Sequence, residues 1–196
     1  EILSGLVGSE MCIRDRLNAN GYQFSSANSM NIGRLVPQIS YYLYTYGQLV
    51  RRQEIKLGDE VNFAVPTGNF GDILAGYYAK KLGLPIKKLI CASNENNVLT
   101  DFFNNGVYDK RRKFHLTNAP AMDILVSSNL ERLLFDLYGE NNYEVASLMN
   151  QLTQRGHYQV SGEVFTKLQK NFAAGFATEE EVKSEIKRVY NYDRYV

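Results

Sequence analysis

A glycine-rich loop between two regular patterns restricts the fold of this chain more than any other feature. Residues 61–65 form a short apolar run, a loop with two glycines lies at 68–72, and a helical pattern extends from 70 to 82. A glycine and a proline end that helix, and a second apolar run follows at 89–92. Strand, helix and strand together have the length of about 30 residues expected for one right-handed βαβ unit. The segment predicts a parallel sheet, and we expect its first strand to be buried on both faces.

A long helix is expected before this unit, after the polar loop at 26–34. Pro37 is placed in its first turn, where a missing N–H does no harm. Residues with helical spacing follow in this helix: Ile39, Tyr42, Leu43, Tyr46 and Leu49. We expect Tyr42 and Tyr46 to lie either in the core or at an interface with a further domain.

The pattern continues toward the C-terminus as strands followed by helices. Polar turns at 93–97 and 127–131 each follow an apolar run, so a third parallel strand is expected just before residue 127. Ser128 and Glu131 have the spacing of a capping box for the next helix. Further helical patterns lie near 143–154, near 163–172 and, with a capping box of Thr178 and Glu181, from residue 178. The sequence therefore predicts an α/β fold, a parallel sheet flanked by helices, with a helical C-terminal part.

Composition excludes several classes of function. The 196 residues are 44% hydrophobic with a net charge of +1, which is typical of a globular chain and argues against nucleic acid as a partner. No apolar run has the roughly 20 residues of a membrane span. Two cysteines favour a reducing, cytoplasmic compartment, and the two histidines have no companions at metal-ligand spacing. We expect neither a membrane nor a metal as a partner.

The first sixteen residues, EILSGLVGSEMCIRDR, have no sustained helical or strand period. They resemble translated sequencing-adapter read-through, and we interpret residues 1–16 as a foreign segment. An ordinary frayed terminus is the alternative. Residues 17–196 carry the remaining analysis.

The glycine loop has two readings. Two glycines allow successive main-chain N–H groups to converge on an anion, and the N-terminus of the following helix adds partial positive charge. Thr67 and Asn69 could donate side-chain hydrogen bonds as well. Alternatively, Asn69 simply caps the helix and Asp72 completes a capping box. The loop matches neither G-x-G-x-x-G nor a P-loop, so nucleotide binding has no specific support.

Three long segments resemble threonine synthase, a pyridoxal-phosphate enzyme of the tryptophan synthase β-like fold type II. They are SSANSMNIGRLVPQISYY, VPTGNFGDILAGYYAKKLGLPIKKLICASNENNVLTDFF and APAMDILVSSNLERLLF, in the order found in that family. The resemblance extends over residues 17–196. It implies that the chain is part of a threonine synthase catalytic core.

The resemblance assigns ligands to residues of this chain. It implies that the cofactor phosphate is bound by Gly68, Asn69, Phe70, Gly71 and Asp72. It also implies that Asn28, Ser29 and Arg34 bind the phosphate of the substrate, although Asn28 and Ser29 could instead cap a helix. A guanidinium suits this role because its planar fork binds phosphate bidentately.

The implied reaction converts O-phosphohomoserine and water into threonine and phosphate. In that family a lysine in a Phe-Lys-Asp segment carries the cofactor, and this chain contains no Phe-Lys-Asp. The Ser-Gly-Asp-Thr loop of the family is also absent. We therefore assign no catalytic residue to this chain and interpret it as an internal fragment that forms no threonine and no borohydride-reducible adduct at a specific lysine.

Two other functions stay open. A serine or threonine dehydratase would use the same cofactor, but its substrate carries no phosphate for Arg34 to bind. A non-catalytic phosphate-binding α/β module would need only the glycine loop.

Overall fold

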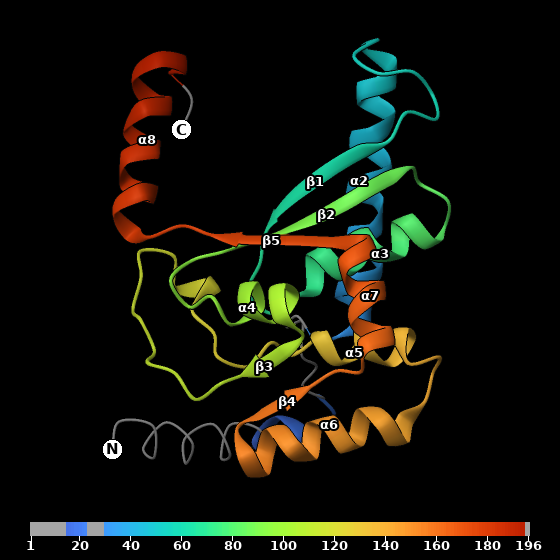
Figure 1. Ribbon diagram of the computed structural model, residues 1–196, viewed down its shortest axis with the longest axis vertical. Coiled ribbons are helices and arrows are strands. Elements are labelled where there is room, and N and C mark those ends of the chain that lie inside the picture. Colours follow the sequence, from blue (N-terminus) through green and yellow to red (C-terminus); the bar gives the residue numbers. More distant parts are fainter. Residues whose placement is uncertain (1–14, 23–29, 195–196) are drawn as a thin grey trace.

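The computed structural model describes residues 15–22 and 30–194 and shows an α/β fold built on a parallel sheet (Figure 1). The elements that follow one another along the chain are α2 (Ile32–Arg51), β1 (Val61–Pro66), α3 (Gly71–Lys81), β2 (Ile86–Ser93), α4 (Val98–Asn105), β3 (Val107–Asp109), the 3₁₀ turn η1 (Pro120–Met122), α5 (Leu130–Leu137), α6 (Asn142–Arg155), β4 (His157–Gln159), α7 (Gly162–Asn171), β5 (Phe172–Phe176) and α8 (Glu179–Asp193). The predicted α/β class is confirmed.

The main sheet has the order β1-β2-β5, and both of its pairings are parallel. The unit of β1, α3 and β2 is the predicted one. The third strand, however, is not the expected run before residue 127. That run is irregular, and η1 precedes it. The third place in the sheet is taken by β5, in which Phe172 pairs with Leu89. β5 was not predicted, because its sequence FAAGF has small residues where a strand usually carries branched ones.

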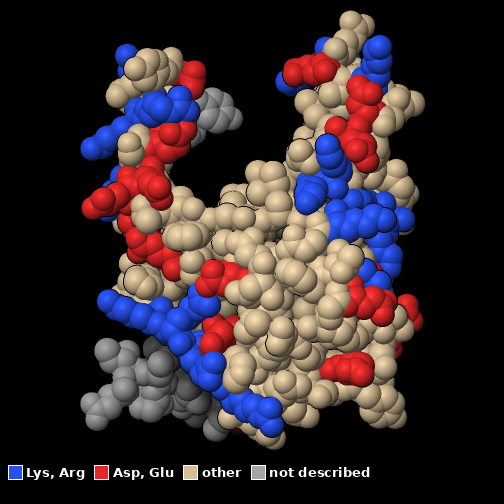
Figure 2. Space-filling view, viewed as in Figure 1, with Lys and Arg blue, Asp and Glu red and all other residues tan. Residues whose placement is uncertain are grey.

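The sheet buries one face, and β1 lies at its edge. Val65 of β1 is buried, whereas its neighbours Ala64 and Pro66 are exposed. The prediction that this strand is buried on both faces is therefore wrong for the described chain, because no described element covers the second face. In Figure 2 a wide gap separates α8 from the end of the sheet at which β1 begins, and uncharged side chains form the floor of that gap.

The core under the covered face is aromatic. Phe70 from the glycine loop, Phe103 from α4 and Phe172 from β5 pack together, with ring centroids 5.0 to 5.8 Å apart. All three side chains are at most 2% exposed. This cluster ties the loop before α3 to the far strand of the sheet.

α2 packs on α3 through a close contact at Gly76. A Cβ at Gly76 would lie 2.7 Å from the ring of Tyr42 and 2.8 Å from Leu89. Tyr42 and Tyr46 are each 4% exposed, so the core position expected as one alternative is confirmed and the interface with a further domain is not needed to cover them. Pro37 lies in the second turn of α2 and not in the first, since the helix begins at Ile32 after the capping residue Asn31.

The C-terminal helices form as predicted, with one difference in capping. α8 begins with the predicted capping box of Thr178 and Glu181, and none of its described side chains is buried. α5 has Asn129 and not Ser128 at its N-cap, and that side chain makes no capping bond. Among the described residues, no helix is both long and apolar enough to span a membrane.

Candidate functional site

A hollow of about 380 Å³ opens at the carboxyl end of β1. The residues lining it are Arg34, Gln38, Pro66, Thr67, Gly68, Asn69, Phe70, Gly71, Asp72, Ile73 and Ala121. The structure thus brings all five loop residues and Arg34, which the sequence singles out, to one place. Larger hollows lie beside α6 and along α8. The hollow at β1 is of greater chemical interest, since strand ends of parallel sheets are where ligands bind.

The start of α3 has no side-chain cap. The N-cap residue is Phe70, with φ of 63° and no capping hydrogen bond. The alternative in which Asn69 caps the helix and Asp72 completes a capping box is therefore wrong. The N–H groups of the first turn have no intrahelical partners, so they are available to an anion.

Burial of the Phe70 side chain offsets the cost of its left-handed backbone conformation. A non-glycine residue in this region costs about 1–2 kcal/mol. Burial of a phenylalanine side chain contributes about 1.5–3 kcal/mol, and Phe70 is only 1% exposed. The aromatic core is thus strong enough to hold the loop in its tight turn.

The carbonyl groups of the loop are bound on one side by the segment before α5. Ser127 Oγ donates to the Gly68 carbonyl at 3.0 Å. Asn129 donates twice to the Asn69 carbonyl, from Nδ2 at 2.8 Å and from its main-chain N–H at 3.2 Å. In a trans peptide the N–H points opposite to the C=O. The N–H groups of Asn69 and Phe70 are therefore directed away from this segment.

Asp72 brings a carboxylate to the lining of the hollow. Tyr42 Oη donates to the Asp72 main-chain carbonyl at 2.9 Å and lies 3.3 Å from its Oδ1. Desolvation raises the pKa of the Asp72 carboxyl, and the Tyr42 hydrogen bond opposes this only in part. Burial and the neighbouring carboxylate together raise the pKa of Tyr42.

The other candidate donors differ from expectation. Thr67 is buried, and its hydroxyl donates to the Val65 carbonyl at 2.7 Å, so it is not a free donor to a ligand. Asn28 and Ser29 lie outside the described residues. Arg34 follows them in the first turn of α2 and lines the hollow.

Lysine is absent from the described residues that line the hollow. Lys80 and Lys81 lie at the opposite end of α3, where Lys81 pairs with Asp136. Lys88 Nζ donates to the Gln169 carbonyl at 3.1 Å. These lysines have structural partners away from the loop.

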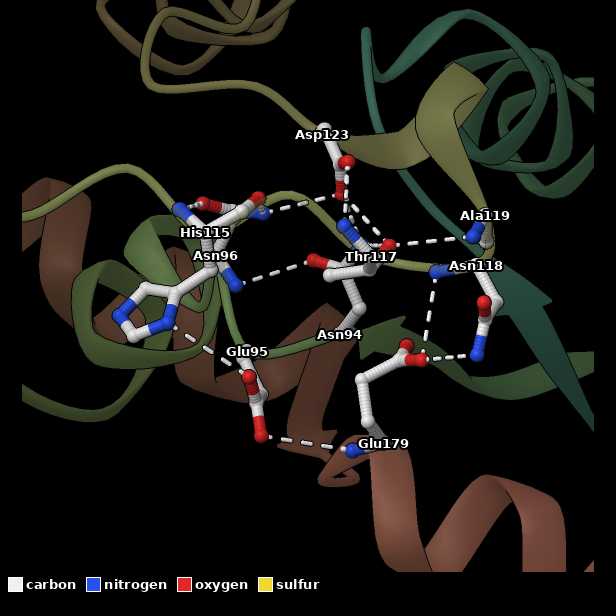
Figure 3. Close-up of polar contacts among 9 residues, drawn as sticks. All are labelled: Asn94, Glu95, Asn96, His115, Thr117, Asn118, Ala119, Asp123 and Glu179. Atoms are coloured by element: carbon white, nitrogen blue, oxygen red, sulfur yellow. Dashed lines mark hydrogen bonds and ion pairs between the residues drawn. The ribbon is translucent and has the colours of Figure 1, made fainter.

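The second predicted polar turn, after β2, is bound to a neighbouring segment (Figure 3). Asp123 accepts from the side chains of Asn94 and Asn96 at 2.7 and 3.0 Å. It also accepts from the main-chain N–H and the hydroxyl of Thr117 at 2.9 and 2.8 Å. Desolvation alone would raise the pKa of Asp123, but these hydrogen bonds hold it below its usual value. The side chains of this turn therefore hold two segments of the fold together.

This network fixes the segment that lines the hollow next to the loop. Ala121, between Thr117 and Asp123, lines the hollow. A Cβ added to Gly68 would lie 3.1 Å from the Ala121 carbonyl oxygen. A side chain at position 68 would therefore push η1 away from the loop by a few tenths of an ångström.

Sequence reasoning missed the residues that hold the loop in place. Ser127 and Asn129 belong to a polar turn that the sequence marks, but their target at Gly68 and Asn69 is about 60 residues away in sequence. Gln38 and Ile73 also line the hollow without a sequence signal. No local pattern encodes such contacts.

Comparison with known proteins identifies close relatives, although no protein-family model matches the chain. Human threonine synthase-like 1 is 45% identical over 177 residues, which are 90% of this chain and 24% of that protein. Threonine synthase of Saccharomyces cerevisiae is 39% identical over 178 residues, covering 86% of this chain and 34% of that protein. The chain therefore spans between a quarter and about a third of these curated relatives.

Solved structures agree with the sequence comparison. The structure of threonine synthase from Brucella melitensis with PLP bound matches 98% of this chain and 40% of its own, with a TM-score of 0.85 and 37% identity. Yeast threonine synthase matches 84% of this chain and 33% of its own, with a TM-score of 0.76 and 40% identity. Over 86–90% of its length, this chain is homologous in sequence to part of the threonine synthases and threonine synthase-like proteins.

Proposed function

We propose that this chain forms the cofactor-phosphate and substrate-phosphate region of a pyridoxal-phosphate-dependent threonine synthase. The reaction would convert O-phosphohomoserine and water into threonine and inorganic phosphate. The observation that carries this proposal is the hollow that joins the uncapped start of α3 to Arg34. The homology to threonine synthases, one of them solved with PLP, supports it.

The residues present fit the phosphate of pyridoxal phosphate. The phosphate would be bound by the main-chain N–H groups at 69–72. They lie at the N-terminus of α3, which carries partial positive charge. The loop carbonyls, which would repel an anion, are engaged by Ser127 and Asn129. When bound, pyridoxal phosphate acts as an electron sink for carbanions of the substrate.

The chain's own residues would bind and orient the reactants. The loop amides would hold the cofactor phosphate, so that its ring is fixed relative to the substrate. Arg34, with Asn28 and Ser29 as further ligands, would bind the substrate phosphate. Because a guanidinium is a cationic, planar fork that matches phosphate oxygens, Arg34 would stabilise the phosphate both in the substrate and as a leaving group.

The lysine that carries the cofactor is not among the described residues that line the hollow. We therefore propose that the region described here supplies binding groups and that the lysine belongs to another part of the enzyme. On this proposal the chain as given has no threonine synthase activity.

The two alternatives make different demands on Arg34. A dehydratase substrate has no phosphate, so Arg34 would have no phosphate to bind in that substrate. A non-catalytic phosphate module would need a single phosphate site. The position of Arg34 in the same lining as the loop supports a substrate that carries a phosphate.

Binding of the substrate to the chain loaded with pyridoxine 5′-phosphate tests the proposal. This analogue has no aldehyde, so it fills the cradle without reacting with lysines. We expect O-phosphohomoserine to bind and homoserine to bind at least about tenfold more weakly, since charge-assisted hydrogen bonds contribute about 1.5–3 kcal/mol. Arg34→Ala should abolish this preference, whereas Arg188→Ala on exposed α8 should not. Equal binding of the two ligands by the unaltered chain would favour a dehydratase, and the proposal would fail.

A further inference from the structure

Asn129 occupies a position in which asparagine normally caps a helix, yet its side chain is used elsewhere. It is the N-cap residue of α5 and makes no side-chain capping bond. Instead, its Nδ2 donates to the carbonyl of Asn69 in the glycine loop, which is distant in sequence. The residue is fully buried, and its Oδ1 has no hydrogen-bond partner in the described structure. A buried amide with an unpaired oxygen is unfavourable for folding, so the contact to the glycine loop is made at a cost to stability.

Ser127 makes the matching contact one residue earlier in the loop. Its hydroxyl donates to the carbonyl of Gly68, and its main-chain N–H donates to Tyr108 Oη at 2.9 Å. Tyr108 Oη in turn donates to the Leu125 carbonyl at 3.1 Å. Tyr108 lies in β3 and stacks on Tyr158 of β4, with ring centroids 5.3 Å apart and planes 7° from parallel. The small two-stranded sheet thus anchors the segment that holds the loop.

The direction of these bonds decides which loop groups an anion meets. Each loop peptide is planar, so binding its carbonyl on one side fixes its N–H on the other. Ser127 fixes the peptide that carries the Asn69 N–H. Asn129 fixes the peptide that carries the Phe70 N–H. Without the side-chain donors these peptides are held less firmly, although the Asn69 carbonyl keeps the main-chain N–H of Asn129 as a partner, and a carbonyl oxygen can more readily turn toward the anion.

We propose that Asn129 and Ser127 are positioning residues that hold the main-chain N–H groups of Asn69 and Phe70 toward a bound phosphate. The inference rests on the proposed function and adds to it two residues that touch neither cofactor nor substrate. Their contribution is to binding, while folding would proceed without them.

Affinity and stability, measured together, test the proposal. The probe is pyridoxine 5′-phosphate, titrated calorimetrically into the full chain. Asn129→Leu keeps the volume and removes the side-chain donor together with the unpaired oxygen, while the main-chain N–H of residue 129 still reaches the Asn69 carbonyl. We expect affinity to fall about tenfold while the urea midpoint of unfolding stays the same or rises, because a lost hydrogen bond weakens binding but the apolar site accepts leucine. Asn171→Leu is the matched control, since Asn171 Nδ2 also donates to a main-chain carbonyl, that of Lys167 at 2.9 Å.

Ser127 provides the second pair of variants, for the case that Asn129→Leu does not fold. Ser127→Ala should weaken binding about fivefold, and Ser127→Thr, which keeps the hydroxyl, should restore it. Affinity unchanged in both Asn129→Leu and Ser127→Ala would overturn the inference. So would equal losses in Ser127→Ala and Ser127→Thr. If the unaltered chain fails to bind pyridoxine 5′-phosphate but stays folded, the proposed function fails instead.

Discussion

At the scale of single residues, the glycine loop combines an unfavourable backbone with favourable anchors. Phe70 adopts a left-handed conformation at the start of α3, and its buried ring packs on Phe103 and Phe172. Gly68 lets η1 approach closely, since an added Cβ would lie 3.1 Å from the Ala121 carbonyl oxygen. The loop can therefore leave its N–H groups without side-chain caps and still hold one shape. A preorganised anion site needs this property.

Asp72 is the residue of the loop whose charge opposes this arrangement. Burial raises its pKa above the value of 3.8 expected in the unfolded chain. The folded state then binds the proton more tightly than the unfolded state. The corresponding stability is present below pH 3.8 and is lost as the pH rises through the folded pKa.

Asp72→Asn should therefore be more stable than the unaltered chain at pH 7, and the difference should shrink as the pH falls toward 3.8. Urea unfolding at several pH values measures this. Asp193→Asn, on the exposed end of α8, is the control and should show no such trend. A gain in stability for Asp72→Asn that is independent of pH would contradict the burial argument.

At the scale of elements, the sequence predicts those units whose signals are local. The unit of β1, α3 and β2 follows from the glycine loop, and the start of α8 follows from the box of Thr178 and Glu181. β5 and the irregular segment before α5 could not be predicted in this way. Residues 172–176 become a strand because Phe172 pairs with Leu89 and joins the aromatic core, and these contacts connect distant parts of the sequence.

The site shows the same limit. The five loop residues and Arg34 are visible in the sequence, and the structure places them around one hollow. For Asn129 the sequence predicts only a polar turn. Its contact with Asn69 depends on how α5 packs against the rest of the molecule, which no local pattern predicts.

The packing of α2 on α3 gives a prediction at this scale. Gly76→Ala would place a methyl group 2.7 Å from Tyr42, which is nearer than van der Waals contact allows. We expect the free energy of unfolding to fall by about 1–3 kcal/mol, as for other overpacked cores. Gly47→Ala in α2 is the control. It has no atoms within 4 Å of an added Cβ and should raise stability by about 0.5–1 kcal/mol. Equal effects of the two variants, measured by urea unfolding, would show that the contact at Gly76 is not tight.

At the scale of the whole molecule, the described chain is well packed on one side and open on the other. Helices cover one face of the sheet, whereas Ala64 and Pro66 on the other face are exposed. Most of α8 stands apart from the body (Figure 1), but its first residue, Glu179, accepts hydrogen bonds from the main-chain N–H and the side chain of Asn118 (Figure 3). The hollow with the glycine loop lies at the carboxyl end of β1, where a parallel sheet places its ligands.

The central claim is that the main-chain amides of the glycine loop bind the phosphate of a pyridoxine derivative. A crystal structure of the chain with pyridoxine 5′-phosphate tests it most directly. The account predicts phosphate oxygens within about 3 Å of the N–H groups at 69–72. A phosphate bound elsewhere on the folded chain, with the loop amides facing water, would contradict it.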